Sequence, residues 1–170
     1  MLIRPLLRLL PLSLLLPATA GAQGVPADTT DGLPAWVAPD TAARSVTLDL
    51  VAEEGRRLNG HREGDIQVVV PAGWTIRLQW RNADSVPHGF VVQVEREKIP
   101  ERAGEPAFQY AYSRSPVAGL PPGRTDHTQF VADTPGWYWI LCGVPGHAIA
   151  GEWIGLRVDP EARGVSVVER

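Results

Sequence analysis

The most informative part of the sequence is residues 135–153, which read PGWYWILCGVPGHAIAGEW. An apolar, aromatic run (GWYWIL) predicts a buried β-strand that ends at Cys142. A turn rich in glycine and proline then leads to His147, and Glu152 begins a second strand pattern at 152–158. A tight loop between two strands can therefore direct a thiolate, an imidazole and a carboxylate at one centre.

Similar strand patterns, separated by turn residues, recur along the rest of the chain. They lie at residues 45–51, 65–70, 74–80, 88–94 and 128–132. No helical period of 3.6 residues persists. The sequence therefore predicts an all-β fold, a β-sandwich of seven or eight strands in which two antiparallel sheets bury their alternating apolar faces. Residues 98–123 mix prolines, charges and aromatics and predict a long irregular excursion.

The N-terminal segment predicts export. Residues 1–22 combine two arginines, a short apolar stretch and small residues before a cleavage site, which is typical of a cleaved signal peptide. The apolar stretch is too short and too often interrupted by proline to span a membrane. Residues 23–43 predict a flexible lead-in, and residues 44–170 a single domain. We therefore expect a periplasmic or other extracytoplasmic protein, with no stable membrane insertion after cleavage.

The composition of the 170 residues narrows the possible functions. The chain has one cysteine, four histidines and a single methionine, Met1. One cysteine excludes an intramolecular disulfide and a cysteine-rich zinc site. The net charge of −3 argues against a nucleic-acid partner. No Ser-His-Asp pattern, phosphate loop or dinucleotide fingerprint is present, so we do not expect an enzyme.

A metal site needs a further ligand from another part of the chain, and His88 is the best candidate. It opens a strand pattern after Pro87, and two strand ends of a sandwich can meet at one pole. One thiolate with two imidazoles suits copper, although zinc also accepts these ligands. Cys142 alone could equally be a buried core thiol. The prediction of a metal site therefore rests on the joint occurrence of Cys142, His147 and His88. The remaining histidines, His61 and His127, lie in polar surroundings typical of surface residues.

Three stretches give the chain a family resemblance. They are PAGWTIRLQWRN at 71–82, SVPHGFVV at 85–92 and the stretch at 135–153 quoted above. In these stretches the chain resembles the cupredoxins, and most closely their sulfocyanin-like branch. The resemblance implies a Greek-key β-sandwich with one mononuclear type 1 copper held by His88, Cys142 and His147. It also implies single-electron transfer outside the cytoplasm, with a redox partner such as a cytochrome or a terminal oxidase.

The sequence departs from this pattern in two places. Glu152 stands where the family normally has an axial methionine, and a carboxylate ligand there would favour Cu(II) and lower the reduction potential. Glu152 could instead point into solvent and leave three-coordinate copper. Gly89 stands where related sites often have a hydrogen-bonding side chain that joins the two ligand loops. Asn82 or Ser85 could substitute for that side chain.

Three functions fit these residues. The leading hypothesis is an electron carrier with a type 1-like Cys-His-His site and Glu152 in the axial position. The second is a copper-binding module for delivery or buffering, without redox turnover. The third is a redox enzyme with carboxylate-bound copper, which is similar in ligand type to the red copper protein nitrosocyanin.

Overall fold

The computed structural model describes residues 32–170, so the expected signal peptide and residues 23–31 of the lead-in lie outside the described residues. These residues form ten β-strands and no helix. The prediction of seven or eight strands was too low, because the three strands it missed have only four, two and four residues and show little periodicity. The strands are β1 (Val37–Asp40), β2 (Ser45–Glu53), β3 (Arg57–Leu58), β4 (Ile66–Pro71), β5 (Trp74–Asn82), β6 (Val91–Val94), β7 (Thr125–Ala132), β8 (Gly136–Leu141), β9 (Trp153–Asp159) and β10 (Ser166–Glu169). Within residues 32–170, no helix has the length and apolar character needed to cross a membrane.

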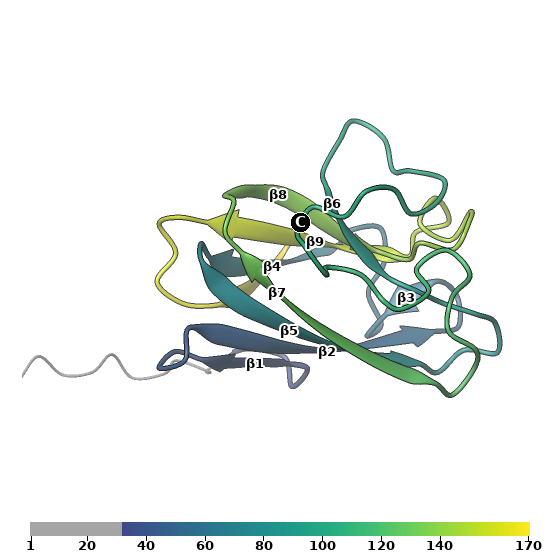
Figure 1. Cartoon of the computed structure of the whole chain (residues 1–170), viewed down its shortest axis with the longest axis horizontal. Helices are drawn as coiled ribbons and strands as arrows, with labels where there is room; N and C mark the ends of the chain where they lie inside the picture. Colours follow the sequence, from purple (N-terminus) through teal and green to yellow (C-terminus); the bar gives the residue numbers. More distant parts are fainter. Residues whose placement is uncertain (1–31) are drawn as a thin grey trace, which may run out of the picture.

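The strands form two sheets that face each other, as Figure 1 shows. One sheet has the order β1-β2-β5-β7, with β3 added beside β2, and the other has the order β10-β4-β9-β8-β6. The prediction of an all-β sandwich is confirmed. The prediction of purely antiparallel sheets is wrong, because β2 pairs with β5 in parallel and β4 pairs with β9 in parallel. Such pairs arise when the chain crosses between the sheets instead of returning through a hairpin.

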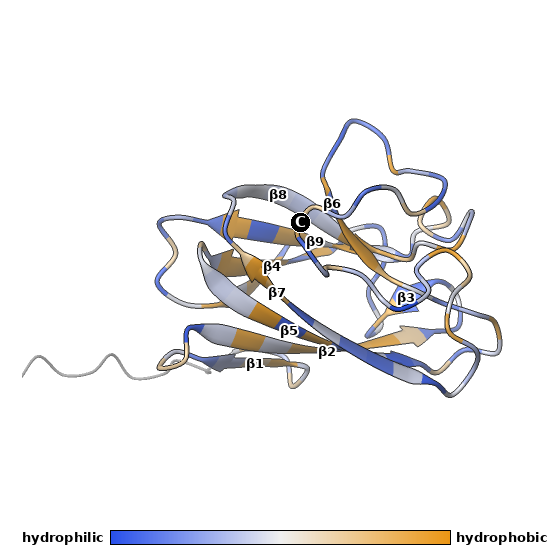
Figure 2. Cartoon of the chain, viewed as in Figure 1, coloured by the Kyte–Doolittle hydropathy of each residue, from blue (hydrophilic) through white to orange (hydrophobic). Residues whose placement is uncertain are grey.

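The core lies between the two sheets, and β5 shows how the sequence builds it. Ile76, Leu78 and Trp80 point inward and are at most 1% exposed. Arg77 and Gln79 alternate with them and are exposed. In Figure 2 the apolar residues lie mainly along the strands, and polar residues prevail in the connecting loops. Complete burial of one large aliphatic side chain stabilises the fold by about 1.5–3 kcal/mol.

The domain begins earlier than residue 44. β1 lies within the segment 23–43 that the sequence predicted to be a flexible lead-in, and it pairs antiparallel with β2. Val37 is 5% exposed and belongs to the main core, so burial of its side chain adds to the backbone pairing. The segment was misread because only a few of its residues carry an apolar pattern.

The strand predicted at 88–94 is shorter than expected, and β6 begins only at Val91. The backbone before it pairs instead with the irregular excursion at 98–123. That excursion contains no strand, in agreement with the prediction. It meets the β5–β6 segment at the isolated bridge His88–Leu120 and the first residue of β6 at the bridge Val91–Tyr112. The excursion thus packs against the segment that carries His88.

Tyr138 provides a test of how β8 is tied to the turn that precedes it. Its hydroxyl donates a hydrogen bond to the Thr134 carbonyl oxygen at 2.7 Å, and its ring lies 4.8 Å from that of Phe108. Burial, with a smaller effect from Asp133, raises the pKa of Tyr138. We expect Tyr138→Phe to lower the free energy of unfolding by about 1 kcal/mol, because one partly buried hydrogen bond is lost. Urea denaturation measures this change.

Tyr110→Phe is the matched control, because Tyr110 is 59% exposed and should tolerate the change. Since the folded state holds the Tyr138 proton more tightly than the unfolded state, its contribution should persist below pH 10 and disappear as the pH rises further. An equal loss of stability in both variants would contradict this assignment.

Candidate metal centre

Four potential ligands meet at one end of the sandwich. They are His88, Cys142, His147 and Glu152, and one donor atom from each lies within 4.8 Å of all the others. His88 comes from the segment between β5 and β6, and the other three from the loop between β8 and β9 (Figure 1). The structure therefore brings together all four residues that the sequence singled out.

The distances between these donor atoms are short. Glu152 Oε1 lies 2.6 Å from His88 Nδ1, and Glu152 Oε2 lies 3.2 Å from His147 Nδ1. Cys142 Sγ is 3.4 Å from His147 Nδ1 and 3.8 Å from His88 Nδ1. His88, Cys142 and Glu152 are fully buried, and the His147 side chain is 12% exposed. The alternative in which Glu152 points into solvent is therefore wrong.

The β8–β9 loop closes on itself through backbone hydrogen bonds. The Cys142 N–H donates to the Glu152 carbonyl oxygen at 2.9 Å, so the first and last of its three candidate ligands are joined at the base of the loop. The Glu152 N–H donates to the His147 carbonyl oxygen at 3.1 Å, and the His147 N–H to the Val144 carbonyl oxygen at 3.1 Å. Since these bonds use main-chain atoms, the three side chains remain available for a ligand.

The two ligand segments are joined through the backbone as well. The Gly143 N–H donates to the Gly89 carbonyl oxygen at 3.3 Å. The excursion adds two contacts to the loop, because the Ala103 N–H donates to the Gly143 carbonyl oxygen and the Gly146 N–H donates to the Glu101 carbonyl oxygen. The excursion therefore holds the β8–β9 loop in addition to the segment that carries His88.

Glycine at positions 89 and 143 is required by this close approach. A Cβ atom at Gly89 would lie 2.7 Å from the Pro116 carbonyl oxygen, and one at Gly143 would lie 2.5 Å from the same atom. Both distances are far below an ordinary contact. Gly89 therefore does not signify a missing link between the ligand segments, because the backbone supplies that link and a side chain would obstruct it.

The electrostatics of the group favour a bound cation. Burial lowers the pKa of His88, but the carboxylates of Glu152 and Asp84 outweigh burial and raise it. Burial, reinforced by Glu152, raises the pKa of the Cys142 thiol well above its usual range. Glu152 Oε2 is buried and forms no well-aligned hydrogen bond, although His147 Nδ1 is near. A cation between these atoms would satisfy that oxygen and deprotonate the thiol.

The donor types fit copper. One thiolate and two imidazoles are ligands that copper prefers, and a single carboxylate completes a set for one ion. Zinc accepts the same donors, but copper stands above zinc in affinity for a given site. The described residues thus offer one group able to hold one copper ion.

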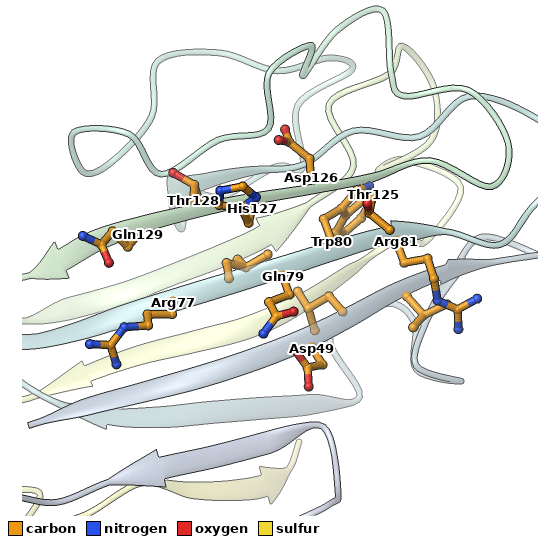
Figure 3. Close-up of a pocket in the computed structure, with 13 residues that line it drawn as sticks. Asp49, Arg77, Gln79, Trp80, Arg81, Thr125, Asp126, His127, Thr128 and Gln129 are labelled. Carbon is orange, nitrogen blue, oxygen red and sulfur yellow. The ribbon is translucent and has the colours of Figure 1, made fainter. Parts of the chain in front are cut away.

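The other two histidines lie away from this group. His61 Nδ1 is 3.3 Å from Asp65 Oδ1, and its side chain is 34% exposed. His127 lies on the outer face of β7, within a groove of about 910 Å³ that runs over β2, β5 and β7. Figure 3 shows it beside Thr128, with Gln79 on the neighbouring strand β5. Both positions agree with the prediction that these histidines are surface residues.

The sequence did not single out Asp84, which contacts a candidate ligand directly. Its Oδ2 atom lies 3.0 Å from His88 Nε2, and its side chain is 7% exposed. Asn82 and Ser85, which were expected to support the ligands, hydrogen-bond instead to Asp84 and to nearby backbone. The spacing of four residues between Asp84 and His88 was the available signal.

Comparisons with known proteins agree with the fold. Residues 37–163 match a family model described as the sulfocyanin (SoxE) domain. A sulfocyanin of Sulfolobus acidocaldarius is 26% identical over 125 residues, which cover 66% of this chain and 63% of that protein. The chain therefore spans somewhat less than two thirds of the length of that relative.

Solved structures of auracyanins share the fold. Reduced auracyanin from Roseiflexus castenholzii superimposes with a TM-score of 0.51 at 23% identity, covering 67% of this chain and 97% of that one. Auracyanin A from Chloroflexus aurantiacus, described as a "blue" copper protein, gives a TM-score of 0.51 at 18% identity, covering 68% and 99%. At these identities the likeness shows the architecture, which is that of a cupredoxin.

The close approach at Gly89 gives a second test. We expect Gly89→Ala to lower the free energy of unfolding by about 1–3 kcal/mol, because the new methyl group must displace the segment at Pro116. Gly164→Ala is the matched control, since a Cβ atom there meets nothing within 4 Å. Thermal and urea denaturation measure both variants. If the two variants proved equally stable, the segment at Pro116 would not hold the ligand loops as described.

Proposed function

The chain belongs to the sulfocyanin family of cupredoxins, and from this premise we propose that it is an exported mononuclear copper protein that carries single electrons. The family binds copper, and its members include electron carriers. The observation that carries the proposal is the convergence of one thiol, two imidazoles and one carboxylate at a buried point. Export rests on the signal-like segment at residues 1–22.

We expect the four side chains to bind the ion with different strengths. Cys142 Sγ, His88 Nδ1 and His147 Nδ1 are the expected strong donors, and a Glu152 oxygen is the expected axial donor. Bound copper would supply a one-electron Cu(II)/Cu(I) couple. The closed β8–β9 loop and its ties to the excursion restrict movement of the ligands. A rigid ligand set suits electron transfer, because little has to rearrange when the charge of the ion changes.

The burial of the group favours a carrier over an enzyme. Three of the four donors are fully buried, and only the His147 edge reaches the surface. Pro145 and Ile149 lie exposed on the same loop, and Ile149 is 60% exposed. We propose that this apolar surface beside His147 docks a redox partner, such as a cytochrome or a terminal oxidase.

A second candidate function is favoured by Glu152. Its carboxylate is fully buried and lies against both imidazoles, so it is placed to ligate copper together with them. Such a centre could belong to a redox enzyme. Binding of small anions to the oxidised protein, seen as a change in its spectrum, would favour that enzyme.

The remaining alternative is a copper-binding module for delivery or buffering. Such a module would pass Cu(I) reversibly to an acceptor and show no accessible Cu(II) state.

The spectrum of the copper-loaded protein tests the proposed site. We expect one copper per chain and an intense visible band, because thiolate-to-Cu(II) charge transfer absorbs strongly. Cys142→Ser should abolish the band, whereas His127→Ala should leave it unchanged because His127 lies on the outer face of β7. Absorption spectroscopy and metal analysis measure both results. A protein that takes up no copper would contradict the proposal.

Replacement of Glu152 tests the axial position. We expect Glu152→Met to raise the reduction potential and to shift the visible spectrum, because a neutral thioether favours Cu(II) less than a carboxylate does. Glu161→Met is the matched control, since Glu161 is an exposed carboxylate outside the group. Redox titration measures both variants. An unchanged potential and spectrum in Glu152→Met would show that Glu152 is not a ligand.

A further inference from the structure

Among residues 32–170, Asp84 is a buried charged residue to which the proposed function assigns no role. Its carboxylate faces the far side of the His88 ring, where Oδ2 lies 3.0 Å from Nε2. The near side of the same ring faces the metal group, with Nδ1 2.6 Å from Glu152 Oε1. The side chain of Asp84 is 7% exposed, and that of His88 is fully buried. The imidazole is therefore held between a candidate ligand and a carboxylate that belongs to no other site.

The structure fixes Asp84 in this position with a dedicated network. Its N–H donates to Asn82 Oδ1 at 2.9 Å, and the Ser85 N–H and hydroxyl both donate to Asp84 Oδ1. Asn82 Nδ2 donates in turn to the carbonyl oxygens of Val86 and Leu120 at 2.8 Å each. One carboxylate oxygen is thus used by the turn, and the other remains directed at the imidazole.

Arg56 is the other charged group near this oxygen. Its Nη1 atom lies 3.9 Å from Asp84 Oδ2, and its side chain is 31% exposed. At that distance and exposure the guanidinium forms a weak ion pair. The shorter contact of Asp84 is with His88, so the imidazole is its principal partner.

The chemistry of imidazole gives this contact a consequence. When Nε2 carries the proton and donates it to a carboxylate, Nδ1 is left with a lone pair directed at the metal. The hydrogen bond also fixes the rotation of the ring and makes Nδ1 a stronger donor. A His88 imidazole that is hydrogen-bonded to the Asp84 carboxylate is a stronger donor, and it stabilises the more highly charged Cu(II) state more than it stabilises Cu(I).

We propose that Asp84 is a positioning residue that acts through His88: it holds the ring with Nδ1 toward the copper and lowers the reduction potential of the site. This inference rests on the proposed function, because it assumes that His88 is a copper ligand. In this proposal, Asp84, Asn82 and Ser85 provide the hydrogen-bonded support for the ligands that related sites often obtain from a side chain at the position of Gly89.

The test compares Asp84→Asn with a matched surface control. Asp65→Asn is that control, because Asp65 forms the same four-residue pairing with His61 but is 49% exposed and lies outside the metal group. Loss of such a carboxylate partner typically weakens metal binding about 10- to 100-fold. We expect Asp84→Asn to lower the Cu(II) affinity about tenfold relative to the Cu(I) affinity, which raises the potential by about 59 mV. Asp65→Asn should leave the potential unchanged. Asp84→Glu keeps a carboxylate, so its potential should lie closer to that of the wild type than the potential of Asp84→Asn does.

A second readout does not depend on electron transfer. In the zinc-loaded wild-type protein, nitrogen-15 NMR should show His88 with a proton on Nε2 that exchanges slowly with water. That signal should shift or disappear in Asp84→Asn and persist in Asp65→Asn. A wild-type ring without a proton on Nε2 would overturn the proposal, even if Asp84→Asn did not fold.

The outcomes separate this proposal from the proposed function. If the wild-type protein takes up no copper, the proposed function fails, and the zinc-loaded ring signal still decides whether Asp84 positions His88. If copper binds and Asp84→Asn folds with the potential and ring signals of the wild type, Asp84 has only a structural role. A raised potential in Asp84→Asn together with the altered ring signal establishes the positioning role.

Discussion

The complete burial of the Glu152 carboxylate is the constraint around which the metal group is built. Transfer of a carboxylate from water into a protein interior is costly unless cations or donors compensate it. The only side chains within ion-pairing distance of Glu152 among the described residues are His88 and His147. One carboxylate oxygen still has no well-aligned hydrogen bond. This arrangement is balanced best when a metal cation is shared by the carboxylate, the imidazoles and the thiol.

The rest of this end of the sandwich holds those four side chains against one another. The β8–β9 loop is closed by its own backbone, and the excursion at 98–123 pairs with the segment of His88 and contacts the loop through residues 101–103. Pro116 lies against both Gly89 and Gly143, so the two ligand segments and the excursion pack as one unit. The irregular segment is thus a structural part of the centre.

The sequence predicted the site better than it predicted the support of the site. Cys142, His147 and Glu152 lie in one loop between two strongly patterned strands, so their convergence follows from local structure. His88 could be added because strand ends meet at a pole of a sandwich. Asp84 could not be found in the same way, because its role depends on a turn in which Asn82 and Ser85 direct its side chain. The roles of Gly89 and Gly143 depend on Pro116, which reaches them through long-range packing that no local pattern reveals. The pairing of β1 was missed because its short segment has little periodicity.

The central claim is that one copper ion is bound by Cys142, His88, His147 and Glu152. Its most direct test is the crystal structure of the copper-loaded protein, with anomalous diffraction measured on both sides of the copper absorption edge. The account predicts one strong anomalous peak within bonding distance of the Cys142 sulfur, the Nδ1 atoms of both histidines and a Glu152 oxygen. A copper peak elsewhere, such as beside His61 or His127, or a centre without these four donors, would contradict it.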